Sequence, residues 1–180
     1  MDIDDFITNV ISRSDQHKCF YHFTATGNIP LIRDEGILAT NTLRTKSLFD
    51  KVITGGNEWS LDADTRVGMD QYVHLCFMSE HPMEYLAREE NRLESTKFLR
   101  IKPEVLKLPG VKITLEVSNK RGCVPLEPSV GLGQADLEVI YKWTDWRLKE
   151  VKNRLKVAKL YEILVPNSIP VELIRNLGNG

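Results

Sequence analysis

The chain has 180 residues, with 24 lysines and arginines against 25 aspartates and glutamates, so its formal net charge is −1. This length suits one domain, and we expect residues 1–180 to bury a core without help from a disulfide or a structural metal. The near-neutral balance excludes a general polyanion binder, although a local basic groove stays possible.

Three separated cysteines, Cys19, Cys76 and Cys123, form no CxxC pair. Their odd number and wide spacing argue against a disulfide framework and a zinc knuckle, and they favour a reducing, cytoplasmic setting. Apolar runs all fall short of the ~20 residues of a membrane span, and the first ten residues are acidic where a signal peptide would be basic. We therefore expect no secretion by that route.

The first half of the chain predicts short elements before a long irregular segment. Helical spacing of apolar residues predicts a helix over 4–12, and an aromatic run predicts a strand over 19–24. A helix is expected over 28–36, because Asn28 can cap it, a proline falls in its first turn and a glycine ends it. Residues 39–71 lack periodicity, and loops of that length are usually functional or mobile.

The second half predicts alternating strands and helices and one long amphipathic helix. In chain order we expect a strand at 72–78, a helix at 82–92, strands at 97–102 and 111–117, a loop at 122–133, the long helix from Leu137 to Leu155, a strand at 160–165 and a short helix after Pro166. Helices and loops alternate irregularly and no phosphate-binding glycine fingerprint is present, which favours α+β with a mixed sheet.

Common catalytic motifs of nucleotide, metal and hydrolase enzymes are absent from the sequence. The four histidines, at positions 17, 22, 74 and 81, are not at metal-ligand spacing with a cysteine or carboxylate. We therefore expect no catalytic metal.

Glu162 is the most unusual residue, because its predicted strand is otherwise made of apolar and aromatic residues. Simple alternation would place it on a solvent face, but that face would also carry Leu160 and Leu164. A functional carboxylate aimed into a cleft is an equally good interpretation.

Other polar residues have ordinary structural explanations from the sequence. His22 in the aromatic strand can be a hydrogen-bonded core residue, and Asn28 can be a helix cap. Arg44 and Arg66 can be solvated charges within the irregular segment.

Three ordered blocks nevertheless resemble one family, the DarT-type ADP-ribosyltransferases, which use NAD to modify nucleic acid. Residues 21–38, beginning Tyr-His-Phe-Thr and continuing Asn-Ile-Pro-Leu-Ile to Gly-Ile-Leu, are similar to its N-terminal signature. Residues 72–85 resemble its Tyr-Val strand followed by Ser-Pro-Met-x-Tyr. Residues 158–170 resemble its Ala-Glu-x-Leu-Val-Pro segment, whose glutamate is catalytic.

The resemblance implies an ADP-ribosyltransferase-like fold with a mainly antiparallel split sheet, and NAD as co-substrate without a metal. It makes Glu162 the catalytic glutamate, puts His22 and Thr24 at the NAD pocket, and lets Asn28 and Gly36 shape the neighbouring helix. The family also uses an arginine before the Tyr-Val strand. In this chain that stretch differs from the family in length and composition. Arg66 is the first candidate for the family's arginine, with a catalytic role, and Arg44 is the second, as an NAD-binding residue.

These roles suit the chemistry of NAD. Cleavage of its glycosidic bond develops positive charge on the ribose, which a carboxylate stabilises while it takes a proton from the acceptor. An arginine can hold the pyrophosphate, and an aromatic side chain can stack on a flat ring; the candidates are Tyr21, Phe20 and Tyr85.

Basic and aromatic residues are concentrated between Lys142 and Lys159, and this segment is the candidate contact for the nucleic acid that accepts ADP-ribose. Single-stranded nucleic acid is bound by such mixtures, so we expect DNA or RNA to contact this segment. The selected residues are Arg147, Lys152, Arg154 and Trp146. A solvated helix face with tryptophans in the core is the structural alternative.

Together these observations predict a toxin or phage-defence effector that ADP-ribosylates a base in single-stranded DNA or RNA and is controlled by an antitoxin. Two alternatives stay open. An RNA 2′-phosphotransferase should show an Arg-His-x-Arg cluster, which this chain lacks, and a non-catalytic nucleic-acid or antitoxin-binding module should show no NAD turnover.

Overall fold

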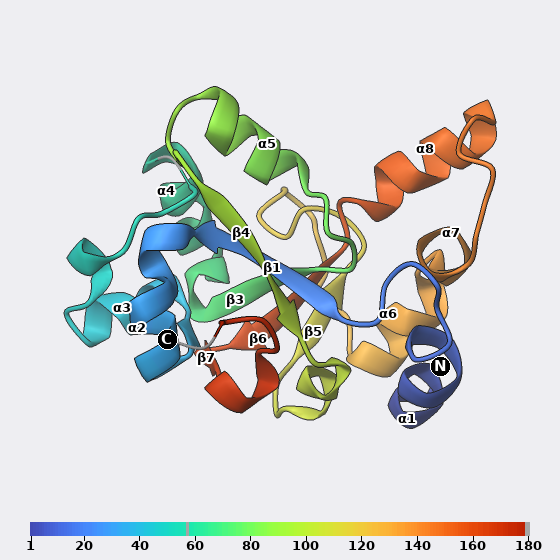
Figure 1. The fold of residues 1–180 in the computed structure, drawn as a ribbon, viewed down its shortest axis with the longest axis horizontal. Helices are drawn as coiled ribbons and strands as arrows, with labels where there is room; N and C mark the ends of the chain where they lie inside the picture. Colours follow the sequence, from blue (N-terminus) through green and yellow to red (C-terminus); the bar gives the residue numbers. More distant parts are fainter. Residues whose placement is uncertain (57, 179–180) are drawn as a thin grey trace.

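A computed structural model of the chain describes residues 1–56 and 58–178 (Figure 1). Its centre is a five-stranded sheet in the order β4-β1-β3-β6-β5, and each strand pair is antiparallel. The strands are β1 (Phe20–Ala25), β3 (Tyr72–Cys76), β4 (Thr96–Ile101), β5 (Lys112–Thr114) and β6 (Glu162–Pro166). The predicted α+β class with a mainly antiparallel sheet is confirmed, and the described strands include no parallel pair.

The sheet is split between β1 and β3. Their register consists of one pair, Tyr21 opposite Cys76, whereas β1 pairs with β4 along its whole length and β3 does the same with β6. Beyond Tyr21 the two central strands therefore diverge. There, backbone groups on their facing edges can form hydrogen bonds with side chains or loops instead of with each other.

A small second sheet joins an early segment of the chain to a segment near its C-terminus. It pairs β2 (Ile37–Leu38) with β7 (Ser168–Ile169), directly after the last turn of α2 (Ile29–Glu35). Gly36 lies at this junction with φ 77°, and a Cβ there would be 2.3 Å from the Ile169 carbonyl oxygen. A glycine is required by both the backbone angle and the close approach.

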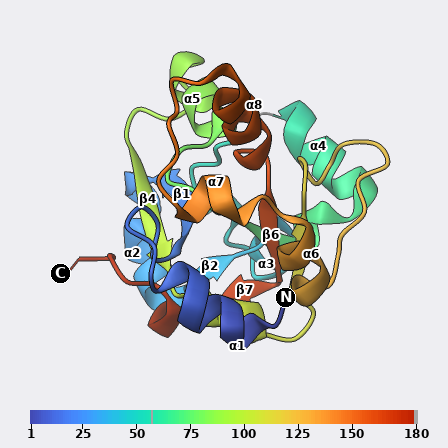
Figure 2. The same ribbon diagram turned by 90° about the vertical axis from the view of Figure 1, so that its right-hand side faces the viewer.

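Helices gather at the two ends of the sheet. In Figure 1, α2, α3 (Thr40–Thr45) and α4 (Glu58–Val67) lie to the left, while α5 (Pro82–Glu89) and α8 (Lys149–Ala158) lie at the top. Figure 2 shows the opposite end, with α1 (Ile3–Asp5), α6 (Pro128–Gln134) and α7 (Leu137–Tyr141). A π-helical segment, Phe6–Ile11, extends α1, and short 3-10 turns occupy Thr26–Asn28, Phe49–Lys51, Met69–Gln71, Pro103–Lys107 and Val171–Leu173.

The predicted long helix is wrong, because the chain leaves the helical conformation at Lys142 (φ −106°, ψ 153°) and re-enters it only at Lys149. Asp145 accepts hydrogen bonds from the backbone and side chain of Arg147, which stabilises the intervening turn. The apolar stripe combined residues from both sides of this break, and Leu148 is exposed.

Four further expectations need correction. The 39–71 segment carries α3, α4 and two 3-10 turns, joined by non-helical residues at 46–48 and 52–56. The expected loop at 122–133 ends in α6, which begins with a proline at its first position. The strand expected over 111–117 is reduced to β5, and the short helix expected after Pro166 is the 3-10 turn at Val171–Leu173.

The main core covers one face of the sheet and includes Phe20, Leu75, Leu99 and Ile163, each fully buried. Helices from both ends of the sheet complete it, with Phe6 packed against Phe20 and Tyr141. Burying these side chains contributes about 1.5–3 kcal/mol each, so this face is the rigid support for the strands that carry the site. No helix of the described chain is both long and apolar enough to cross a membrane.

Candidate active site

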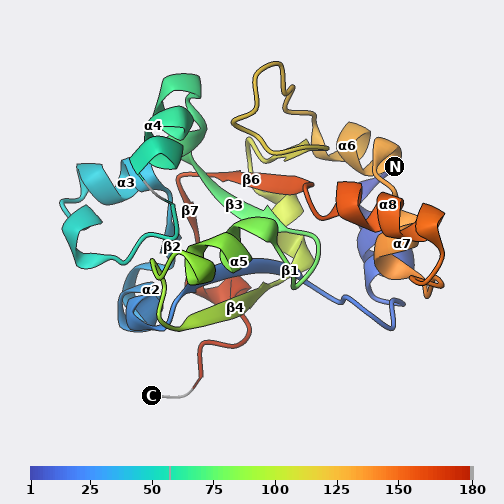
Figure 3. The same cartoon turned by 90° about the horizontal axis from the view of Figure 1, so that it is seen from above.

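A cavity of about 480 Å³ follows the split between β1 and β3. Its walls come from the middle of both strands, the start of β6, the segment 52–56, α4, α5 and residues 117–119. Figure 3 shows α4 and the loop after β5 on the same side of the sheet, above β3 and β6. This volume falls within the range of small-molecule sites.

Glu162 opens β6 inside this cavity. Its strand neighbours in register are Cys76 and Thr114, and the residue is only 6% exposed. The backbone N–H of Ser118 donates to its Oε2 at 3.1 Å. Alternation therefore does not bring Glu162 to solvent, because β6 lies between two strands and both of its faces are covered.

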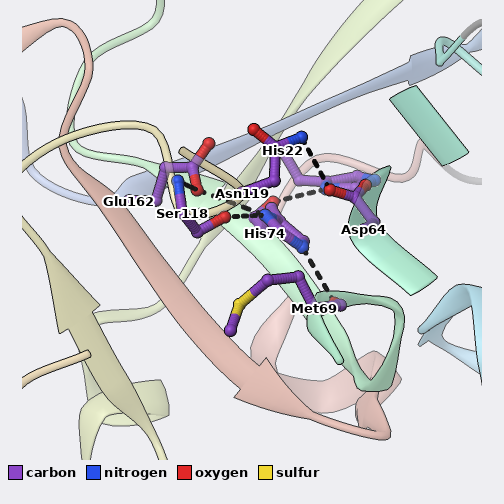
Figure 4. Close-up of polar contacts among 7 residues, drawn as sticks. All are labelled: His22, Asp64, Met69, His74, Ser118, Asn119 and Glu162. Carbon is purple, nitrogen blue, oxygen red and sulfur yellow. Dashed lines mark hydrogen bonds and ion pairs between the residues drawn. The ribbon is translucent and has the colours of Figure 1, made fainter. Parts of the chain in front are cut away.

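His74 on β3 is the partner of Glu162, and Figure 4 shows the two side chains directed toward each other. Its Nδ1 lies 3.3 Å from Glu162 Oε2 and its Nε2 lies 3.1 Å from the Met69 carbonyl oxygen. Ser118 Oγ is a further 3.3 Å contact of Nδ1. Because both ring nitrogens face acceptors, the doubly protonated imidazolium fits this position.

The electrostatics of the pair agree with that geometry. Burial by itself would lower the pKa of His74, but the hydrogen bond and charge of Glu162, with the charge of Asp64, raise it to about 9. Burial likewise opposes ionisation of Glu162, yet the hydrogen bond and charge of His74 lower its pKa below the ordinary value. The pair is therefore an imidazolium and a carboxylate at neutral pH.

His22 lines the same cavity from β1, where Nδ1 lies 3.0 Å from the His74 carbonyl oxygen. Burial lowers the pKa of His22, so the ring is neutral. A carbonyl can only accept, so Nδ1 carries the proton and Nε2 is left as an acceptor. This bond spans the point where β1 and β3 diverge and replaces a strand-to-strand pair.

Asn28 occupies the N-cap position of α2 as the sequence predicts, but its side chain makes no capping bond to the helix. Instead Nδ2 donates to Thr24 Oγ1 at 3.1 Å and to the Ile53 carbonyl at 2.8 Å, and Oδ1 accepts from the Ile53 N–H at 2.9 Å. Local spacing could not reveal this, because the partner is 25 residues away in sequence. Asn28 thereby fixes the wall segment 52–56 beside Thr24.

Asp64 and Asn119 meet at the cavity, joining α4 to the loop after β5. Asn119 Nδ2 donates to Asp64 Oδ1 at 2.8 Å, and both residues line the cavity (Figure 4). Burial raises the pKa of Asp64, although the nearby charge of His74 opposes that effect. Two segments far apart in the sequence are thus held together over the Glu162 pair.

Neither arginine selected from the sequence lines the cavity. Arg66 is exposed on α4, and Arg44 on α3 contacts Thr65, Asp70 and the Phe49 ring. Arg92, which follows α5, does line the cavity. Its Nε donates to Glu90 at 2.7 Å, while Nη1 is buried and has no hydrogen-bond partner among the described residues.

The aromatic candidates are also displaced from the cavity. Phe20 belongs to the main core, Tyr21 packs with Cys19 and Cys76, and Tyr85 is exposed on α5. The aromatic side chains that line the cavity are Phe23, Trp59 and Tyr72. Tyr21 forms the one registered pair between β1 and β3, so it precedes the diverging part of β1 that lines the cavity.

Sequence reasoning missed His74, Ser118, Asp64, His81 and Arg92 as members of this site. His74 could have been found as a second polar residue in an apolar strand, the same signal that singled out Glu162. The others come from loops, from the ends of α5 and, for Asp64, from within α4, and their meeting depends on the tertiary fold.

The basic segment near α8 surrounds a second cavity of about 660 Å³. Trp143 and Trp146 line it and are exposed, and Lys152 lies 5.8 Å from the centre of the Trp146 ring. Arg147 is paired with Asp145, and Arg154 with Asp136 and Glu138. Lys159 is paired with Glu80, so among the described residues the cations of the segment that line this cavity without an acidic partner are Lys152 and Lys156. Arg154 joins α8 to α7.

The described residues contain no group of three histidine, cysteine or acidic side chains placed to hold a metal ion. The site offers a cavity with an ionised carboxylate at one wall and the neutral imidazoles of His22 and His81 beside it. An enzyme that stabilises developing positive charge on a ligand needs this arrangement.

Comparison with known proteins defines the class. Two structures from Thermus sp. 2.9, DarT in complex with ADP-ribosylated ssDNA and DarT in complex with NAD+, match with TM-scores of 0.62 and 0.56 at 19% and 20% identity. They cover 86% and 87% of this chain and 78% of each matched chain. The chain therefore has the fold of an ADP-ribosyltransferase.

Thermosipho africanus DarTG in complex with ADP-ribose matches with a TM-score of 0.62 at 17% identity over 87% of this chain, which spans 42% of the length of that protein. No curated protein sequence matches. The model of the family described as "ssDNA thymidine ADP-ribosyltransferase, DarT" matches residues 21–179. The chain belongs to the DarT family, and the resemblance found in the sequence is confirmed.

The ion pair makes a direct prediction about titration. In the folded protein His74 should titrate near pH 9, and in Glu162→Gln its pKa should fall, because only the charge of Asp64 and the bond to the Met69 carbonyl then oppose burial. A pKa raised on folding stabilises the protein fully below the unfolded value of 6.5, so the free energy of unfolding should decrease between about pH 6.5 and 9. NMR titration of the imidazole signals checks this, and an unchanged pKa in the variant would disprove the pairing.

Proposed function

We propose that this protein transfers ADP-ribose from NAD+ to a thymine base in single-stranded DNA, with Glu162 as its catalytic carboxylate. The observation that carries the proposal is a buried carboxylate held in the ionised state at a cavity wall. The family description names this acceptor class, and a Thermus relative is described with ADP-ribosylated ssDNA.

The reaction requires one bond to break and one to form. The bond from the ribose C1 to nicotinamide breaks, nicotinamide leaves as a neutral ring, and positive charge develops on the ribose. Glu162 stabilises that charge, and it receives the proton that the acceptor nitrogen loses as its new bond to C1 forms. Both hydrogen bonds to Glu162 end on Oε2, which leaves Oε1 for these tasks.

His74 and Ser118 serve Glu162 as positioning residues. Burying a lone carboxylate is costly, and the imidazolium with the Ser118 N–H compensates for it. The same contacts fix the direction of the carboxylate, so little reorganisation is needed when charge develops.

Residues of the cavity are suited to NAD+. His22 offers Nε2 as an acceptor, Thr24 and Asn28 form the adjacent wall, and Arg92 offers an unpaired guanidinium nitrogen. A planar guanidinium binds phosphate oxygens with two parallel donors. We assign the pyrophosphate to Arg92 in preference to Arg66 and Arg44, which lie outside the cavity wall.

The acceptor strand is assigned to the second cavity. Its wall includes residues 78–80, and residue 81 lines the Glu162 cavity, so the two hollows share one short segment. Exposed tryptophans supply stacking surfaces, and Lys152 and Lys156 supply positive charge beside them, whereas Lys159 is paired with Glu80. A strand bound there would lead toward Glu162.

The biological setting follows as a proposal from the same family. A DNA-modifying enzyme needs control, so we propose a cytoplasmic toxin or phage-defence effector restrained by an antitoxin. RNA is the alternative acceptor. An RNA 2′-phosphotransferase is disfavoured, because the described cavity has one arginine in its wall and no cluster to hold a 2′-phosphate.

Glu162→Gln should abolish ADP-ribosyl transfer while leaving NAD+ binding largely intact, because the change removes the charge and keeps the shape. Turnover of labelled NAD+ with a thymine-containing oligonucleotide measures the effect, with exposed Glu104→Gln as the matched control. Carboxylate contributions of this kind are worth roughly 100-fold or more, so retention of about a tenth of wild-type turnover would contradict the assignment.

Arg92→Lys should raise the KM for NAD+ about tenfold and leave the KM for DNA unchanged, because the forked donor is lost while the charge stays. The matched Arg66→Lys change, on exposed α4, should alter neither constant. A larger rise in the KM for NAD+ in Arg66→Lys than in Arg92→Lys would contradict this assignment and indicate that Arg66 binds the pyrophosphate.

The double change Trp146→Ala and Lys152→Glu should raise the KM for DNA steeply and make it less dependent on salt. With one phosphate contact fewer, DNA binding releases fewer counterions. Lys149→Glu is the control, since it changes the same charge on the same helix outside the cavity wall. Circular dichroism verifies the fold. Equal effects of the two changes would place the acceptor elsewhere.

A further inference from the structure

The wall of the active-site cavity formed by the start of α5 carries a polar group that the reaction described above does not use. His81 is the N-terminal cap of α5 and is only 7% exposed. Its Nδ1 accepts a hydrogen bond from the Met83 N–H at 3.2 Å. The side chain therefore stabilises the helix start in the way that serine or asparagine does elsewhere.

This bond determines which nitrogen carries the proton. Since Nδ1 accepts from a backbone donor, the neutral ring has its proton on Nε2. Burial lowers the pKa of His81, which keeps the ring neutral in spite of the negative charge of Glu162 nearby. His81 thus holds a single N–H donor in a fixed direction.

That donor is buried and has no hydrogen-bond partner among the described residues. Leaving a buried donor unpaired is costly, and such groups are rare enough to need a reason. His81 lines the cavity and stacks on Phe23, whose ring centre is 6.0 Å away at an interplanar angle of 23°. The donor therefore stands at the edge of a flat aromatic wall close to Glu162.

We propose that His81 binds the carboxamide oxygen of the nicotinamide ring of NAD+ through Nε2–H. The group it needs is a carbonyl acceptor on a planar ring, located next to the bond that Glu162 acts on. Nicotinamide fits each of these requirements, and the hydrogen bond orients the ring while also favouring its departure. This inference rests on the proposed function and adds the residue that recognises the leaving group.

The test compares NAD+ with ADP-ribose, which lacks nicotinamide. Both ligands are titrated by calorimetry into the full chain carrying Glu162→Gln, so that NAD+ is not consumed, with and without His81→Ser. Serine can cap α5 through its hydroxyl but has no donor at the position of Nε2. The Kd for NAD+ should rise about tenfold, as expected for one buried hydrogen bond, and the Kd for ADP-ribose should change less than about twofold.

A second variant separates binding from folding. His81→Asn keeps the cap through its carbonyl oxygen and restores an N–H donor, so it should recover part of the NAD+ affinity, and melting temperatures report whether the helix start survives. Equal losses for both ligands, or no loss for either, would overturn the proposal. An unchanged NAD+ affinity with a raised Kd for a thymine-containing oligonucleotide in the same background would assign the donor to an acceptor base instead and overturn the proposal. Failure of NAD+ to bind the Glu162→Gln chain at all would refute the proposed function itself.

Discussion

The site depends on one ionic hydrogen bond, between Glu162 on β6 and His74 on β3. A carboxylate in the middle of a sheet is tolerable only when a positive charge and further donors accompany it. Here the imidazolium and the Ser118 N–H provide them, and the Met69 carbonyl binds the second ring nitrogen of His74. The charges that make the pair possible also keep Glu162 ionised for its proposed role.

The split of the sheet is the second constraint. Because β1 and β3 share a single registered pair, their diverging ends leave space that a continuous sheet would fill. Polar side chains replace the missing ladder: His22 bonds to the His74 carbonyl, and Asn28 bonds to both backbone groups of Ile53. The cavity reaches the edge of the main core, where Ile37, Val73 and Leu75 belong to both.

Much of the fold could be predicted from the sequence, because strands and short helices with clear periodicity and end signals depend on local residues. Glu162 was found because it interrupts an apolar strand, and His22 and Thr24 because they stand in a family signature. Arg92 and Ser118 could not be found in this way. Both residues lie in loops, and the spacing of residues along the sequence does not predict which loops the fold brings together.

The break between α7 and α8 illustrates the opposite failure. Apolar residues on both sides of Trp143 and Trp146 happened to continue one helical stripe, although the turn around Asp145 separates them. The consequence for function is substantial, since the break exposes both tryptophans beside lysines at a second cavity.

The most direct measurement is a crystal structure of the Glu162→Gln protein with NAD+. The account predicts density for the dinucleotide along the split between β1 and β3, with the nicotinamide ribose beside position 162 and the carboxamide toward His81. Density for NAD+ elsewhere on the molecule, with this cavity filled only by solvent, would contradict the assignment of the active site.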